Sequence, residues 1–183
     1  MTSQPNHFRS PALAPFGHAT FRAVWLASIA SNFGGLIQSV GSAWLMASIS
    51  SSNDMVALVQ TSITLPIMLF SLVSGAIADS HDRRKVILVA QVFMLVVSVA
   101  LTVFAWMGWL SPRSLLAFTF LIGCGTALNN PSWQASVGDM VPREHLPAAV
   151  ALNSVGFNLT RSVGPAIGGA IVAAFGAAAA FAV

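Results

Sequence analysis

Residues 75–85 concentrate the charged side chains of this sequence. The 183 residues contain eight Lys or Arg and five Asp or Glu, and five of these thirteen charges lie in this stretch of eleven residues. Uncharged sequence flanks it over 55–78 and 86–110, and each run is long enough to cross a bilayer as a helix, at about 20 residues per crossing. The stretch is therefore predicted to be a short turn between two membrane-spanning helices, with its acids and bases close enough to pair.

A second set of chemistry-bearing residues lies inside the apolar runs, where polar side chains are costly and point to function. Arg161 is the only charge deep within such a run, about 20 Å from the start of its predicted helix at about 1.5 Å per residue. Asn158 precedes it by three positions and Gly164 follows by three, so the three are expected to share a face. Other runs add further amides, namely Asn32, Gln38, Asn129, Asn130 and Gln134.

Two interpretations of these polar residues stay open. In the first, Asn32, Gln38, Asn129, Asn130, Asn158 and Arg161 line a substrate path, in which Arg161 meets an anionic part of the substrate. In the second, Arg161 locks helices together through backbone carbonyls or side-chain amides. Intramembrane arginines in helical bundles do both.

No acid or histidine lies inside the apolar runs. A proton-coupled transporter usually places such a group in its pathway, so a main proton carrier is expected outside the part supplied. An integral membrane enzyme would need clustered catalytic groups, which argues against an enzyme. The single cysteine, Cys124, lies in an apolar run, so neither a disulfide framework nor a thiol-based metal site is indicated. No cofactor or metal is expected.

Composition sets the class of protein. Hydrophobic residues make up 56% of the chain and charged residues 7%, whereas a soluble domain carries about 25% charged residues. This composition has too few charged residues to cover the surface of a soluble fold. The net charge of +3 comes from a few basic residues at helix ends, so it does not indicate nucleic acid. The expected class is an all-α integral membrane bundle, with the lipid bilayer as partner.

Five spans and the start of a sixth are expected. A polar tail over 1–20 precedes the membrane bundle of 21–183, and the predicted spans are 21–49, 55–78, 86–110, 115–137 and 148–175, with the sixth starting at 177. The chain stops inside this last apolar run, which suggests a truncated polypeptide.

The basic residues predict the orientation. Arg113 falls on one side of the membrane, and six bases fall on the other: Arg9, Arg22, Arg83, Arg84, Lys85 and Arg143. Lys and Arg favour the cytoplasmic side. The N-terminus and the charged turn are therefore predicted to be cytoplasmic.

The fifth predicted span carries a small-residue motif made of Gly164, Pro165, Gly168 and Gly169. Small residues four apart let helix backbones approach closely, and proline permits a kink that neighbouring helices tolerate. An ordinary packing seam would look the same.

Together these motifs resemble the major facilitator superfamily. Its loop pattern Gly-x-x-x-Asp-x-x-Gly-Arg-Arg/Lys is matched by Gly75, Asp79, Arg83 and Arg84, while Asp82 replaces the second glycine. The span-five motif resembles the antiporter-associated motif of the family. The earlier glycine is Thr160 here, and the family's span-four arginine is absent, so the antiport inference is weakened.

A closer resemblance is to the transmembrane secretion effectors, which include enterobactin-exporter-like proteins. It extends over about 15–183 and rests on Phe21-Arg22-x-x-Trp25-Leu26, Asp79-x-x-Asp82-Arg83-Arg84, Asn130-Pro131, Val141-Pro142-Arg143-Glu144 and Asn158-x-x-Arg161-x-x-Gly164-Pro165. The resemblance implies twelve spans in two halves, so this chain is most of the N-terminal half and its partner is the missing C-terminal half.

The resemblance also implies a function, namely alternating access around a central site. The loop residues Gly75, Asp79, Arg83 and Arg84 would form a latch, in which Asp79 contacts the second half and Arg83 pairs with acids at the cytoplasmic face. The plainer alternative is that the bases only fix orientation. The expected protein is an exporter of a small organic molecule, a drug or siderophore, in the bacterial inner membrane. The alternatives are a non-transporting membrane scaffold and an inactive truncated half-transporter.

Overall fold

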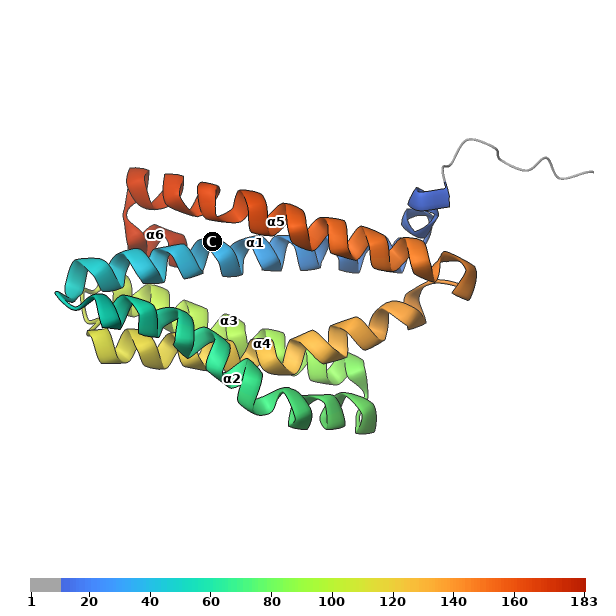
Figure 1. The fold of residues 1–183 in the computed structure, drawn as a ribbon, viewed down its shortest axis with the longest axis horizontal. Coiled ribbons are helices and arrows are strands. Elements are labelled where there is room, and N and C mark those ends of the chain that lie inside the picture. Colours follow the sequence, from blue (N-terminus) through green and yellow to red (C-terminus); the bar gives the residue numbers. More distant parts are fainter. Residues whose placement is uncertain (1–10) are drawn as a thin grey trace, which may run out of the picture.

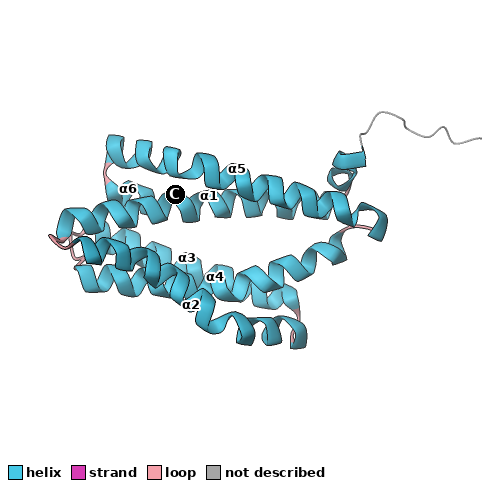
Figure 2. Cartoon of the chain, viewed as in Figure 1, coloured by secondary structure: helices cyan, strands magenta, loops and turns pink. Residues whose placement is uncertain are grey.

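The computed structural model describes residues 11–183, with the side chains of Ala78 and Asp79 left out. This part of the chain folds into five long helices and three short ones, without strands, in the order η1 (Pro11–Gly17), α1 (Ala19–Ile49), α2 (Asn53–Ser80), α3 (Arg83–Trp106), α4 (Pro112–Met140), η2 (Arg143–His145), α5 (Leu146–Phe175) and α6 (Ala177–Phe181). Figure 2 shows that short turns join them. The expected all-α fold is confirmed.

Local sequence signals explain where the helices begin and end. The side chain of Asp82 accepts a hydrogen bond from the backbone N–H of Arg84 at 3.0 Å and caps α3, as Asp commonly does at this position. Ser111 and Ser114 form a reciprocal capping box at the start of α4. Gly176, at φ 84°, ends α5, because that backbone conformation suits glycine.

Within residues 11–183, three helices are long and apolar enough to cross a membrane on length and composition, namely Ala19–Ile49, Asn53–Ile77 and Arg83–Trp106. α4 and α5 are as long, with 29 and 30 residues, but they are not among these three. The count of five spans plus a sixth therefore stays a prediction.

The helices form two layers, which Figure 1 shows from the side. α5 and α6 pack with α1, and α2, α3 and α4 pack with one another. The layers meet at the end that carries the α1–α2 and α3–α4 turns, where an apolar cluster joins Met46, Val59, Leu101, Leu115 and Phe181. They diverge toward the end that carries the α2–α3 turn and η2.

Small residues let α5 lie close against α1. Gly156, Thr160, Gly164 and Gly168 recur every fourth position and are buried. A Cβ added at Gly164 would lie 3.0 Å from Leu36, and one added at Gly168 would lie 3.1 Å from the Cα of Ile37. Thr160, which stands where the family pattern has glycine, is fully buried in the same seam. The packing role of these residues is therefore evident in the structure.

Candidate functional site

The α2–α3 turn consists of His81 and Asp82 only. The guanidinium of Arg83 reaches from this turn to the end of α4, where Nη1 donates to Oδ2 of Asp139 at 2.9 Å and to the carbonyl of Ala135 at 3.3 Å. Arg83 therefore pairs with an acid outside the turn, as the family resemblance implied, and not with its neighbour Asp82. Its carboxylate partner lies 56 residues further along the chain, because the fold brings the two helix ends together.

The Arg83–Asp139 pair is accessible to solvent. Its side chains are 36% and 70% exposed, and pairs of this kind contribute about 0–1 kcal/mol. Such a contact can break and re-form at little cost. Arg84 and Lys85 are exposed beside it.

The two other loop-motif residues are less fully placed. Asp79 lies in the last turn of α2, and its side chain is outside the described part of the structure. Gly75 lies one turn earlier, and a Cβ added there would meet nothing within 4 Å. A glycine inside a helix costs about 1 kcal/mol relative to alanine, and no contact among the described residues accounts for Gly75.

Two of the candidate path residues tie helices together. Nε2 of Gln38 in α1 donates to Oγ of Ser98 in α3 at 3.2 Å. Nε2 of Gln91 in α3 donates to Oδ1 of Asn129 in α4 at 3.4 Å. Ser98 and Gln91 were missed by sequence reasoning, although their polarity within an apolar run was a usable signal.

Asn130 lies in a different setting from its neighbour Asn129. Together with Gln134, one turn later on α4, it lines a hollow of about 460 Å³ between α2 and α4. Ser71 contributes a hydroxyl from α2, and the remaining lining residues are Ile67, Ala127 and Pro131. The volume is within the range of small-molecule pockets, about 300–1,000 Å³. The lining offers uncharged hydrogen-bonding groups.

Asn158 and Arg161 lie on an exposed face of α5, whereas Gly164 is buried against α1. The expectation that these three residues share a face is therefore wrong for Gly164. The guanidinium carbon of Arg161 lies 5.7 Å from the centre of the Phe157 ring. Among the described residues this is its one assigned side-chain interaction, so helix locking within this chain is not supported.

The span-five motif divides between two faces in the same way. Gly164 and Gly168 are buried in the seam with α1, while Pro165 and Gly169 are exposed. A Cβ added at Gly169 would meet nothing within 4 Å. Asn32 is half-buried on α1.

Comparison with known proteins gives a consistent set of relatives. The sequence matches the family described as transmembrane secretion effector over residues 10–183. It is 29% identical over 119 residues to an uncharacterized MFS-type transporter of Bacillus subtilis, covering 65% of this chain and 27% of the relative. It is 28% identical over 143 residues to the staphyloferrin A transporter of Staphylococcus aureus, covering 78% of this chain and 36% of the relative.

A third relative is the multi-drug resistance efflux pump PmrA of Streptococcus pneumoniae, at 28% identity over 119 residues, covering 65% of this chain and 29% of the pump. The chain thus spans about a third of the length of the curated relatives that it matches. No solved structure matches it significantly.

Proposed function

This chain belongs to the transmembrane secretion effectors, a family of the major facilitator superfamily, and we propose that it forms part of a secondary transporter that exports a small organic molecule. Because the family consists of transporters, the chain is a multi-pass membrane protein and not an enzyme. The names of two relatives, a staphyloferrin A transporter and a multi-drug efflux pump, support a drug or a siderophore as the class of cargo.

The observation that carries this proposal is the hollow between α2 and α4. Asn130, Gln134 and Ser71 bring hydrogen-bonding groups to it in a chain with 56% hydrophobic residues. Polar groups at membrane depth are expensive and mark transport pathways. A membrane scaffold has no need for an amide-lined hollow, so that alternative is not favoured.

In the proposed protein, this chain supplies one half of an alternating-access pair of six-helix halves, and the remainder of the transporter supplies the other. The short length relative to the curated relatives fits such a division. The open surroundings of Gly75 and Gly169 fit close approach by further helices. Five complete spans, the start of a sixth and a cytoplasmic N-terminal tail are part of the proposal.

The α2–α3 turn is proposed to be the latch between states. Arg83 holds the turn to Asp139 through an exposed ion pair, which is weak enough to exchange partners. Asp79 is proposed to contact the second half. A carboxylate at that place gains from a helix N-terminus in the partner half.

Arg161 is proposed to attract the anionic part of the substrate. Its position on an uncovered face of α5 leaves it free to meet a substrate or the second half. Its contact with the Phe157 ring orients the guanidinium without neutralising its charge.

The test is export by cells that express the full-length transporter. We expect Asp79→Asn to reduce efflux of its substrate about tenfold, which corresponds to a coupling free energy within the usual range of about 1–3 kcal/mol. The amount of protein in the membrane should not change, because the substitution removes a charge from the turn and leaves the apolar helices intact. If the Asp79→Asn variant exported substrate at the wild-type rate, the latch would be rejected. Absence of export by the unaltered protein, across siderophores and drugs, would reject the transporter itself.

A further inference from the structure

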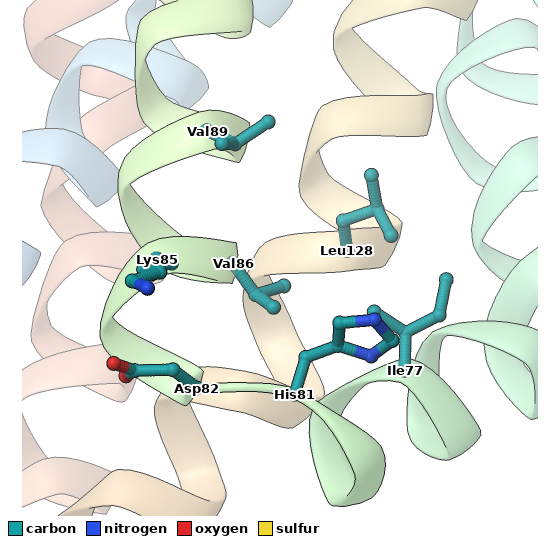
Figure 3. A pocket seen from close by; sticks show the side chains of 7 residues that line it. All are labelled: Ile77, His81, Asp82, Lys85, Val86, Val89 and Leu128. Carbon is teal, nitrogen blue, oxygen red and sulfur yellow. The ribbon is translucent and has the colours of Figure 1, made fainter.

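A second hollow, of about 420 Å³, lies between the ends of α2 and α3 on a floor formed by α4 (Figure 3). Its apolar lining comes from Ile77 of α2, Val86 and Val89 of α3 and Leu128 of α4. Its remaining lining residues are His81, Asp82 and Lys85. Figure 3 shows these three near the turn, with Val89 and Leu128 toward the other end of the hollow.

The hollow extends from the turn into the apolar part of the bundle. Val89 lies six residues after Arg83 on α3, which is about 9 Å at about 1.5 Å per residue. Leu128 lies seven residues before Ala135, whose carbonyl binds Arg83, so it is at a similar depth of about 10 Å. The hollow therefore has a charged mouth at the level of the turn and an apolar interior.

The outer surface around the hollow is strongly apolar. Leu88 and Val89 on α3 are 63% and 64% exposed. α3 also has the highest mean hydropathy of the candidate spans, 2.7. Side chains of this kind face lipid hydrocarbon in a membrane bundle, so α3 is the side on which a lipid would reach the hollow.

Apart from the Arg83–Asp139 pair, the described side chains at the mouth include two bases, Arg84 and Lys85, and one acid, Asp82. Arg83 is paired with Asp139, and the Asp82 carboxylate is engaged by the backbone N–H of Arg84. Lys85 is exposed and lines the hollow, and Arg84 is exposed next to it. Lys and Arg side chains near a membrane surface attract anionic headgroups.

From this arrangement we propose that the hollow binds one anionic phospholipid, with an acyl chain between Val86, Val89 and Leu128 and the phosphate beside Lys85. The apolar walls and the bases at the mouth match a molecule that is anionic at one end and hydrocarbon at the other. Such a lipid would fill the gap between α2 and α3, two helices that contact each other little within this chain.

The sequence supplies a specific probe, because Lys85 is the only lysine among the 183 residues. The purified protein in maltoside micelles is treated with an amine-reactive ester, and acylation of Lys85 is followed by peptide mass spectrometry. We expect phosphatidylglycerol to slow the acylation of Lys85 about fivefold relative to phosphatidylcholine, the effect of about one basic contact with an anionic lipid. The amino group of Met1 reports the general effect of micelle charge.

A matched pair of variants separates the hollow from the surface. Val89→Trp fills the hollow, whereas Leu88→Trp adds the same ring to an equally exposed neighbour that does not line it. We expect Val89→Trp to abolish the protection of Lys85 and Leu88→Trp to retain it. Equal protection in both variants, or an equal slowing of Lys85 and the Met1 amine, would reduce the effect to surface charge and overturn the proposal.

Two further outcomes decide the identity of the occupant. Protection by glycerol phosphate alone would show a headgroup site without an acyl chain, and would overturn the lipid proposal. Protection of Lys85 in delipidated protein would place a protein segment in the hollow, with the same consequence. Should Val89→Trp fail to fold, Lys85→Met tests the same point: native mass spectrometry should show about fivefold less retained phosphatidylglycerol and unchanged phosphatidylcholine.

Discussion

The α1–α5 seam and the α2–α3 turn are built on opposite principles. In the seam, Gly156, Gly164 and Gly168 are buried and bring two helices into close apolar contact. At the turn, α2 and α3 touch little, and Arg83 holds the turn to α4 mainly through an exposed ion pair with Asp139. Close packing resists change, whereas an exposed pair costs little to break. The comparison assigns the rigid role to the seam and the moving role to the turn.

A large loss of stability is expected where the seam is overfilled. Gly168→Leu should lower the free energy of unfolding by about 1–3 kcal/mol, because a Cβ at Gly168 already lies 3.1 Å from the backbone of Ile37. Gly169→Leu is the matched control, since a Cβ there meets nothing within 4 Å, and its effect should stay within about 0.5 kcal/mol. Thermal unfolding of the chain in detergent measures both. Equal destabilisation would remove the distinction between the two faces of α5.

The exposed face of α5 is tested through Arg161. If its charge meets an anionic substrate, Arg161→Ala in the full-length transporter should reduce export more than about tenfold, because removal of one partner of a close charge pair costs about 2–5 kcal/mol. Arg161→Lys should retain more activity, since the charge remains. Efflux of the identified substrate measures both, and equal, mild effects would favour a packing role instead.

A smaller effect is expected in the hollow between α2 and α4. Gln134→Leu should weaken substrate binding about fivefold, through the loss of one hydrogen bond of about 1 kcal/mol. Gln60→Leu removes an exposed amide from α2 outside that hollow and should leave binding unchanged. Binding titration of the full-length protein gives both values, and indistinguishable variants would exclude the hollow as a substrate contact.

The smallest effect is expected at the turn itself. Asp139→Asn should change the free energy of unfolding by less than about 1 kcal/mol, because both partners of the pair are partly exposed. The difference from wild type should shrink further at high salt, which screens exposed charges. A loss of several kcal/mol, unaffected by salt, would make the pair a structural anchor and contradict its role in a moving element.

Local features of the sequence predicted the helices well. The observed ends of α1 to α5 lie within four residues of the ends of the expected apolar ranges. Helix ends are set by local signals such as Asp82, Ser111 and Gly176, which act only on the neighbouring backbone and can therefore be read from the sequence. The all-α class followed from composition for the same reason, since apolar runs of this length have few alternatives.

The relations between helices could not be predicted from the same signals. Sequence spacing gave no indication that Arg83 reaches Asp139, nor that Gly164 faces α1 while Arg161 stays uncovered. These relations depend on how each helix is rotated about its axis relative to its neighbours. That rotation is set by contacts between helices that are distant in the sequence. The hollow beside Lys85 was missed because its floor, Leu128, is contributed by a helix distant in sequence.

The account depends most on where the α2–α3 turn lies relative to the membrane. A single thiol at the turn, from His81→Cys in a Cys124→Ser background, can be labelled with a membrane-impermeant maleimide. The account predicts labelling in inside-out vesicles and none in intact cells. Labelling in intact cells alone would place the turn outside the cell and contradict both the orientation and the latch.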